Sequence, residues 1–395
     1  MRPSNIALET DGPAALGGPW PWGAAFSADP RAWVLESGEP PARWLLLASR
    51  AVPSDLSAAE QARQASLADA GTRDLIGRLP DWVGGEPLSG HDSPRFAPNL
   101  LSLLADMGVR AGDDPRVDRV LEQMLLHQDA EGRFQSYAPL RGGEQPVWGA
   151  LLCDTHAILE VLVRYGRGAD PRVRAGLAAM AGDLVETAQG RAWPCRRDPA
   201  TGFRGPGRAA DCCPQVALEA LRTFAWLPES EWPGGLLDVA RVSLGVWRGR
   251  GERKPYMFGH GKQFKAVKWP PTWYRVDAVL DALGRYPALW RGPDADPDDR
   301  QALAELAACL IAYNMGEGGR VVPRSTYRGF EGFSFGQKRR PSAFATARLL
   351  AVLHRLDDLA PEALAIDVGV LASSKGGSGR AVLPPLAQPS APRGA

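Results

Sequence analysis

Cysteine is the residue type in this sequence with the clearest capacity for chemistry. Four of the five cysteines fall within one stretch of about sixty residues: Cys153, Cys195, Cys212 and Cys213. Thiolates are soft ligands that select zinc, and a thiolate activated by a metal is a nucleophile. The odd count and the clustering favour metal binding or reactive thiols over disulfides. Burial as small apolar side chains is the competing interpretation.

Asp154 and His156 extend this group of candidate ligands. Asp154 follows Cys153 directly, and His156 lies three residues after Cys153, on the same face of a helix. Tetrahedral zinc needs four ligands, so we predict a zinc site with Cys153, Cys195, Cys213 and His156 as ligands, with Asp154 or Cys212 as alternatives for the fourth position. A histidine packed in the core is the alternative role of His156.

An internal repeat indicates which elements position these residues. Five apolar segments with helical periodicity align on five leucines that recur about every sixty residues: Leu101, Leu159, Leu218, Leu280 and Leu350. Helices that are apolar on most sides are typical of elements packed between other helices. The alignment places Arg95, Cys153, Cys212, Tyr274 and Phe344 at equivalent positions.

Amphipathic segments alternate with these apolar ones. They begin near Asp114, Asp170, Gly235 and Asp298, mostly with the Asp or Pro that caps a helix. Residues 41–52 and 57–79 supply a sixth pair of segments. Buried helices that alternate with amphipathic ones predict an all-α fold, an α/α toroid of about six pairs of inner and outer helices. An open solenoid is the rival, but its repeats usually span about 33–47 residues.

Composition sets the boundaries and excludes some partners. We expect an irregular N-terminal segment at 1–39, the toroid at 40–372, and a disordered tail rich in Gly, Pro and Ser at 373–395. The formal net charge of +1 argues against nucleic acid as a partner. The sequence has no apolar leader and no apolar run of about 18 residues, so we expect a cytoplasmic protein without a transmembrane segment.

Turns rich in Gly follow the amphipathic helices. The clearest is Gln128-Asp-Ala-Glu-Gly132-Arg-Phe134, and a second runs from Gln189 to Trp193. The first turn resembles the glutamine-to-tryptophan turn of squalene and oxidosqualene cyclases. Together with the helix pairs, it makes residues 40–370 similar to a single-domain member of the terpenoid cyclase and protein prenyltransferase toroid superfamily, which includes lanthipeptide cyclases.

This resemblance implies an enzyme that acts on an apolar, isoprenoid-like substrate in a central cavity. Class II terpene cyclases protonate the substrate with the middle acid of an Asp-x-Asp-Asp-Thr-Ala motif. The counterpart here is 151–155, and Cys153 stands where that acid would be. A thiol is a poor proton donor to an alkene, so protonation-initiated cyclisation is not expected. Prenyltransferases and lanthipeptide cyclases instead hold zinc at this location through Asp, Cys and His, which supports zinc as the cofactor.

In a toroid the N-termini of the inner helices converge at one end, which we call the rim. The repeat places Cys153, Asp154, Cys213, Tyr274 and Arg275 there, and Cys195 lies close enough in sequence to reach it. We therefore take Asp154, Cys153 and Tyr274 as candidate catalytic residues, acting as acid, base or activated nucleophile.

Two long segments, 254–275 and 324–340, interleave cations with aromatic residues ahead of inner helices. We predict that they cover the rim and supply an anion clamp and an aromatic wall, suited to a diphosphate head group and an apolar tail. Solvated loop charges are the competing interpretation. The candidate substrate-binding residues are Trp193, His260, Lys262, Lys265, Trp273, Arg275, Arg328 and Phe344.

Two further functions stay open. One is a non-catalytic toroid that binds a ligand or a protein partner. The other is a glycan-active α/α barrel, which needs paired carboxylates in its cavity; Asp154, Asp211 and Asp277 are the candidates. The sequence does not indicate an oligomeric state.

Overall fold

Helices account for most of the regular structure in a computed structural model of the chain, which describes residues 16, 19–138, 145–198 and 202–373. The strands in this part of the chain are two or three residues long, and each pairs with one other strand. The structure therefore confirms the all-α class.

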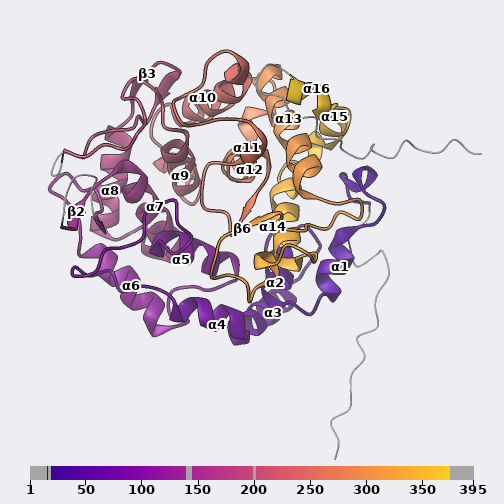
Figure 1. The fold of residues 1–395 in the computed structure, drawn as a ribbon, viewed down its shortest axis with the longest axis horizontal. Helices are drawn as coiled ribbons and strands as arrows, with labels where there is room; N and C mark the ends of the chain where they lie inside the picture. The colour runs from indigo at the N-terminus through magenta and orange to yellow at the C-terminus, as the bar shows by residue number, and fades with distance from the viewer. Residues whose placement is uncertain (1–15, 17–18, 139–144, 199–201, 374–395) are drawn as a thin grey trace, which may run out of the picture.

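The five repeat leucines lie on five of six helices that occupy the middle of the molecule (Figure 1). All five leucine side chains are 0% exposed, as expected for helices enclosed by other helices. The sequence repeat is thus a structural repeat. The six helices are α2 (Pro40–Ala48), α5 (Ala97–Asp106), α7 (Leu152–Leu162), α9 (Pro214–Phe224), α12 (Val276–Leu283) and α14 (Ala343–His354).

The remaining helices lie mainly towards the periphery (Figure 1). They are α1 (Pro30–Glu36), α3 (Leu56–Ala68), α4 (Ala70–Gly77), α6 (Pro115–Leu125), α8 (Pro171–Gly182), α10 (Leu236–Arg248), α11 (Lys262–Lys265), α13 (Pro297–Asn314), α15 (Ala360–Leu364) and α16 (Val368–Ser373). The middle helices pack against one another in chain order from α5 to α14, and α14 packs against α2. The first and last of the six are therefore in contact.

An Asp-Pro pair starts four of the peripheral helices: α1, α6, α8 and α13. In each, the aspartate accepts a hydrogen bond from the second backbone N–H of the helix, at 2.8–2.9 Å. The proline occupies the first helical position, where a backbone N–H would have no acceptor within the helix. These starts are therefore fixed locally by the sequence.

The Gln128 turn links two peripheral helices. The Gln128 side chain donates to the carbonyl of Gly132 at 2.6 Å and to the carbonyl of Arg172 at 2.8 Å, and so ties the end of α6 to the start of α8. Gly132 has a φ of +91°, and a Cβ there would lie 2.9 Å from the carbonyl oxygen of Ala175. Only glycine fits this position without strain.

Replacing Gly132 by alanine is expected to lower the free energy of unfolding by about 2–4 kcal/mol, because a left-handed backbone and a backbone clash both penalise the new methyl group. Gly112 is a matched control: its φ is +86°, but a Cβ there would meet nothing within 4 Å. Gly112→Ala should cost only about 1–2 kcal/mol. Urea unfolding of both variants measures the difference; equal losses would mean that the contact with Ala175 is unimportant.

The short strands form three pairs that fasten loops to one another. β1 (Ser136–Ala138) and β2 (Val147–Gly149) are antiparallel, as are β3 (Val185–Thr187) and β4 (Gly190–Ala192). β5 (Lys268–Trp269) pairs in parallel with β6 (Ser325–Thr326). The two loops rich in cations and aromatic residues are therefore joined to each other.

The structure differs from the sequence-based expectation at two places. The segment 1–39, expected to be irregular, contains α1, and Trp22 donates its indole N–H to the carbonyl of Leu353 at 3.1 Å. The segment 57–79 forms two helices, because Asp69 is extended and caps α4 by accepting from the backbone of Thr72. Residues 374–395 of the expected disordered tail lie outside the described residues.

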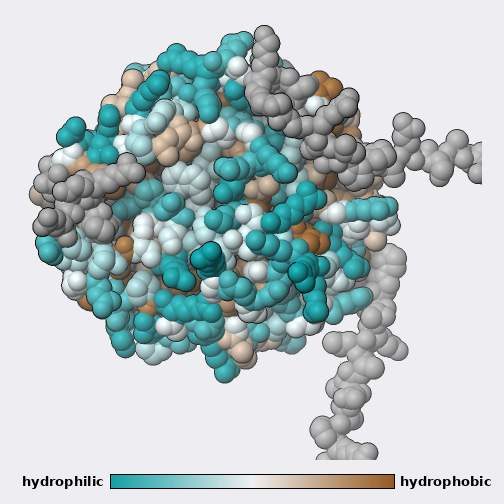
Figure 2. Space-filling model, in the orientation of Figure 1, coloured by the Kyte–Doolittle hydropathy of each residue, from teal (hydrophilic) through white to brown (hydrophobic). Residues whose placement is uncertain are grey.

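Hydrophilic side chains cover most of the face shown in Figure 2, and apolar residues form small separate patches there. Among the helices of the described ranges, none has the length and apolar character needed to cross a bilayer.

Candidate functional site

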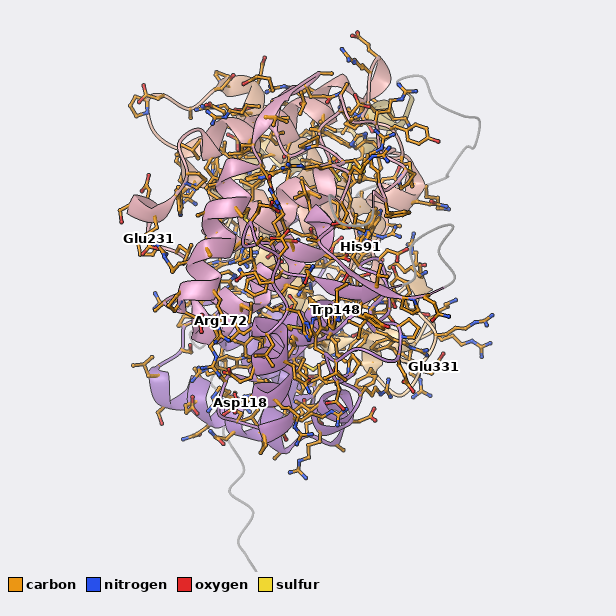
Figure 3. The ribbon with its side chains drawn as sticks, turned by 90° about the vertical axis from the view of Figure 1, so that its left-hand side faces the viewer. His91, Asp118, Trp148, Arg172, Glu231 and Glu331 are labelled. Atoms are coloured by element: carbon orange, nitrogen blue, oxygen red, sulfur yellow. The ribbon has the colours of Figure 1, made fainter. Side chains whose placement is uncertain are left out.

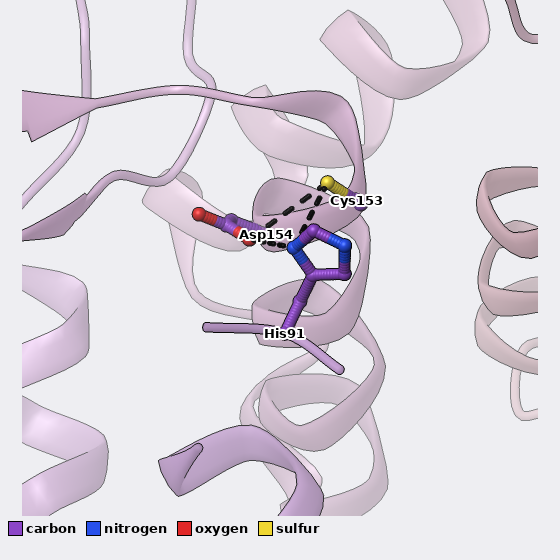
Figure 4. Close-up of side chains that lie close together, drawn as sticks. All are labelled: His91, Cys153 and Asp154. Carbon is purple, nitrogen blue, oxygen red and sulfur yellow. Dashed lines mark hydrogen bonds and ion pairs between the residues drawn. The ribbon is translucent and has the colours of Figure 1, made fainter. Parts of the chain in front are cut away.

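His91, Cys153 and Asp154 meet at one point near the start of α7 (Figure 4). Cys153 and Asp154 lie in the first turn of α7, while His91 comes from the loop between α4 and α5. Figure 3 shows His91 towards the same end of the molecule as Glu331 and away from Glu231. The site thus lies where the N-terminus of a middle helix meets a long loop.

Three ligand atoms face one another at this site. Nδ1 of His91 lies 3.1 Å from Oδ1 of Asp154 and 3.4 Å from Sγ of Cys153, and this sulfur lies 3.8 Å from Oδ1. Tetrahedral zinc, with Zn–S near 2.3 Å and Zn–N or Zn–O near 2.0–2.1 Å, separates its ligand atoms by about 3.3–3.6 Å. The separations and the donor types therefore fit a zinc ion with three protein ligands.

Neighbouring side chains hold His91 in place. The Asn99 amide donates to the carbonyls of His91 at 2.7 Å and Ser93 at 2.9 Å, which fixes the loop onto α5. The imidazole packs against the ring of Trp273, with a centroid distance of 5.4 Å. The His91 side chain keeps 27% of its surface exposed, so solvent reaches the site at the imidazole.

Ser136 on β1 supports the third member of the site. Its hydroxyl donates to Oδ2 of Asp154, while Oδ1 faces His91. The position of Asp154 in the first turn of α7 also suits a negative charge, because the N-terminal end of a helix is electropositive. Ser136 and the helix together orient one carboxylate oxygen toward His91 and Cys153.

Burial and mutual charge set the protonation of the group. Burial raises the pKa of the Cys153 thiol to about 11, and the neighbouring His91 offsets part of that rise. Burial alone would lower the pKa of His91, but the charges and hydrogen bonds of Cys153 and Asp154 outweigh it and hold the pKa well above its ordinary value.

The structure does not assemble the predicted ligand set of Cys153, Cys195, Cys213 and His156. Within the described ranges, one group of three His, Cys, Asp or Glu side chains has its ligand atoms within 4.8 Å of one another, and it consists of His91, Cys153 and Asp154.

Each of the other predicted ligands has a packing role. His156 is fully buried, donates from Nδ1 to the carbonyl of Val216 at 3.1 Å, and packs edge-on against Trp193. Cys195 packs against the backbone near Gly205 and Gly207. Cys212 and Cys213 are buried, and burial raises the pKa of both thiols.

Tyr274, the third candidate catalytic residue, lies in an aromatic cluster. It is buried, and its hydroxyl hydrogen-bonds Nε2 of His260 at 2.9 Å. The rings of Phe258 and Phe264 pack against it, with centroid distances of 5.2 and 5.1 Å. Both residues therefore pack within this cluster and are not part of the group formed by His91, Cys153 and Asp154; their catalytic and binding roles stay predictions.

Most of the predicted substrate-binding residues are engaged elsewhere. Arg275 donates to the backbone carbonyls of Gln263 and Ala266, so it holds a loop and does not face a cavity as an anion clamp. Lys262 and Arg328 are exposed on the surface. Three others contact neighbouring residues. The Trp193 indole donates to the Met180 carbonyl at 2.7 Å, and Nζ of Lys265 lies 5.3 Å from the centroid of the Tyr313 ring. The rings of Phe344 and Phe335 pack with their centroids 5.4 Å apart.

Trp273 is the member of that set which lines a cavity. The hydroxyls of Thr272 and Tyr327, one from each long loop, both donate to the carbonyl of Asp92 at 3.3 and 3.4 Å. Both loops therefore contact the loop that carries His91.

A cavity of about 50 Å³ lies among α5, α7, α9, α12 and α14, with Trp273 in its wall. Its wall is polar and charged, in contrast to the predicted aromatic wall. Arg164 pairs with Asp106 at 2.5 Å, and Arg222 pairs with Glu160 at 2.9 Å. The other ion pairs of this wall are Arg348 with Asp106 and Arg285 with Asp281; Arg355, which is not in the wall, also pairs with Asp281.

The carboxylates required for a glycan-active barrel are dispersed. Asp277 lines the central cavity, Asp154 belongs to the site with His91, and Asp211 accepts from the Gln189 side chain at 3.0 Å and from the backbone of Tyr256 at 3.2 Å. Asp211 therefore holds two loops together, and each of the three carboxylates has a different set of neighbours.

A larger cleft of about 900 Å³ borders the His91 loop. Ser89 and Pro94, on either side of His91 in the sequence, form part of its wall. The rest of the wall combines apolar side chains with two arginines: Val83, Leu88, Leu100, Phe330, Arg78 and Arg95. The volume is in the range of sites that bind drug-sized molecules, about 300–1,000 Å³.

Comparison with known proteins does not identify a function. No protein-family model matches the chain, and no curated protein matches it. A crystal structure of a protein from Actinoplanes aligns with 80% of this chain and 88% of its own chain, at 15% sequence identity and a TM-score of 0.38. At that TM-score the likeness carries no argument about fold or function.

Proposed function

We propose that the chain is a zinc-dependent enzyme of the terpenoid cyclase and prenyltransferase type, with His91, Cys153 and Asp154 as the metal ligands. The observation that carries the proposal is the convergence of one nitrogen, one sulfur and one oxygen at separations close to those of tetrahedral zinc. Three protein ligands leave a position for a substrate atom, which is the arrangement of catalytic rather than structural zinc.

The proposed fold is the α/α toroid of that superfamily. Six helices in the middle, each followed in the chain by peripheral helices, support it, as does the contact between α14 and α2. An open solenoid would keep its first and last helices apart.

Zinc bound here would supply Lewis-acid chemistry and favour the deprotonated form of a thiol. The chain's own residues prepare the site for it. Ser136 orients the Asp154 carboxylate, and Asn99 anchors the backbone of His91. Trp273 packs against the imidazole ring.

We place the apolar, isoprenoid-like substrate in the 900 Å³ cleft beside the His91 loop. The central cavity, at about 50 Å³ and with charged walls, is too small and too polar for it. Val83, Leu88 and Phe330 offer an apolar wall for a tail. Arg95, exposed at the cleft, offers a cation for an anionic head group.

Replacing Ser136 by alanine is expected to weaken zinc binding about 10–100-fold, the usual cost of losing a hydrogen bond that orients a metal ligand. Competition with a chromophoric chelator measures the affinity. Ser243→Ala is the matched control, since it removes another buried hydroxyl, one that donates to the Val239 carbonyl on α10. An unchanged affinity in the Ser136 variant would exclude Asp154 as a ligand held by Ser136.

A further inference from the structure

The two long loops, 254–275 and 324–340, carry a local excess of positive charge. They contain ten Lys and Arg residues against one acidic residue, Glu331, whereas the whole chain has a formal net charge of +1. Seven of the ten cations are exposed, and none of the seven forms an ion pair within the described residues. Unpaired charges of one sign attract a partner of the opposite sign. The seven are Lys254, Lys262, Arg324, Arg328, Lys338, Arg339 and Arg340.

β5 and β6 join the two loops into one surface. Their parallel pairing sets Lys268 opposite Ser325. Nζ of Lys268 lies 3.7 Å from the centroid of the Tyr327 ring on the other loop. Figure 3 shows Glu331, which belongs to the second loop, at the outer surface of the end that carries His91. We call the exposed side chains of the two loops the basic surface.

The first loop also presents two large side chains to solvent beside its cations. Tyr256 and Met257 are 48% and 56% exposed, and they follow Lys254 closely in the sequence. Met257 has a φ of +72°, a left-handed conformation that costs free energy for a residue other than glycine. Backbone strain of this kind is concentrated where a segment has a function. Aromatic residues, Met and Arg are enriched in protein-binding surfaces, so the composition of this loop favours a protein partner.

The cations near the first loop act together on a buried neighbour. Burial, and to a lesser extent the charges of Arg250, Lys254 and Lys265, lowers the pKa of His260 to about 4. Positive charges disfavour the protonated imidazole, so the three cations act in the same direction on one group. The potential at this end of the basic surface is therefore positive.

The tyrosine rings of this surface favour a peptide over a nucleic acid. The guanidinium of Arg208 lies over the ring of Tyr256, 5.4 Å from its centroid, and Lys268 lies over the ring of Tyr327. Proteins that bind single-stranded nucleic acid stack bases on open aromatic faces, and here a cation already occupies a face of each ring. Carboxylates need no such face, because they pair with Arg and Lys side chains directly.

We propose that the basic surface binds an acidic peptide segment of a partner protein. The carboxylates of the segment pair with the exposed cations of both loops, and an apolar side chain of the segment packs against Tyr256 and Met257. None of the side chains of this surface is a proposed zinc ligand. The interaction therefore goes beyond the proposed function and does not depend on it.

Fluorescence anisotropy of labelled peptides tests the proposal on chelator-treated, zinc-free protein, so that the result is separate from that for the metal site. The first probe is a decapeptide of six Glu, two Leu and two Gly; in its two counterparts Gln replaces every Glu, or Ser replaces every Leu. At low salt the first probe should bind at least about fivefold tighter than the Gln peptide, because each exposed ion pair contributes about 1.4-fold or more. It should bind at least about threefold tighter than the Ser peptide, because that peptide buries less apolar surface.

Two results with these probes would overturn the proposal. One is equal affinity for the Glu and Gln peptides, or no saturable binding of either. The other is tighter binding of an oligothymidylate with six phosphates than of the first probe, which would assign the basic surface to nucleic acid.

Two double variants locate the contact. Lys254→Glu/Arg340→Glu reverses one charge on each loop and should weaken binding of the first probe at least about fourfold, because two attractive pairs are lost and two repulsive ones form. Arg119→Glu/Arg174→Glu changes the net charge equally on α6 and α8, whose starts lie away from Glu331 in Figure 3, and should bind the probe as the unaltered chain does. Equal weakening in both would mean that binding follows net charge alone, and would refute the basic surface as the site.

Met257→Asn tests the apolar contact, since asparagine tolerates a left-handed backbone. The variant should bind the first probe and its Ser counterpart with equal affinity. A preference for the Leu-containing peptide that is as large as in the unaltered chain would refute the assigned contact with Met257.

Discussion

Replacing His91 by alanine is expected to raise the dissociation constant for zinc by more than about 100-fold. The variant loses one of three protein ligands, whereas the loss of a residue that only orients a ligand typically costs about 10–100-fold. Cys153→Ser should have a similar effect, because a hydroxyl is a poor ligand for zinc compared with a thiolate. Chelator competition on protein prepared without an affinity tag measures both changes.

Two controls make this result specific. His354 lies at the end of α14 and hydrogen-bonds Asp357 at 2.8 Å, so His354→Ala removes a histidine remote from the site. Cys195→Ser removes a cysteine that the sequence places among the ligands and the structure does not. Both should bind zinc as tightly as the unaltered chain. If Cys195→Ser lowered the zinc affinity as much as Cys153→Ser does, the cluster of thiolate ligands expected from the sequence would be supported. His91 would then be rejected as a ligand.

Replacing Arg222 by methionine is expected to lower the free energy of unfolding by about 3–5 kcal/mol, the usual cost of leaving a buried charge unpaired. Arg222 holds both oxygens of Glu160, at 2.9–3.0 Å, and Glu160 is 5% exposed. Urea unfolding gives the change. Arg167→Met, which removes a half-exposed ion pair with Glu122 at 2.9 Å, should cost less than about 1 kcal/mol.

The double variant Glu160→Gln/Arg222→Met separates pairing from packing. Since both charges are removed together, it should be more stable than Arg222→Met alone. If the double variant is the less stable of the two, the loss comes from packing of the arginine stem, and the unpaired charge is not the cause.

The apolar core could be predicted from the sequence because it repeats. The leucine period locates five of the middle helices, and the Asp-Pro starts locate several peripheral ones, since both signals are local. The split at Asp69 was missed because a single residue with extended backbone breaks an otherwise continuous helical pattern.

The residues of the proposed metal site could be predicted from the sequence only in part. The sequence indicates Cys153 and Asp154 by type and position, but His91 is not among the ligands expected from it. Its position carried a signal: it lies four residues before Arg95, the repeat equivalent of Cys153, and therefore near the same end of a middle helix. Cys195 and Cys213 were predicted as ligands from their residue type. The repeat does not determine the geometry of the loops, and in the structure these two side chains are not part of the group with His91.

The charged central cavity also has a sequence signal. Among its lining residues, Glu160 and Asp281 each follow a repeat leucine directly, and Arg164 and Arg285 each lie five residues after one. Polar residues at the same repeat position on several helices must face the same region when those helices pack side by side. The pairing between them depends on side-chain geometry, which only the structure provides.

X-ray absorption at the zinc edge, on tag-free protein loaded with one equivalent of zinc, tests the metal site most directly. A site formed by His91, Cys153 and Asp154 predicts one sulfur near 2.3 Å, with nitrogen and oxygen near 2.0–2.1 Å completing the shell. Loss of the sulfur in Cys153→Ser would assign it. Two or more sulfurs per zinc, a shell of oxygen alone, or failure to retain zinc would contradict the assignment.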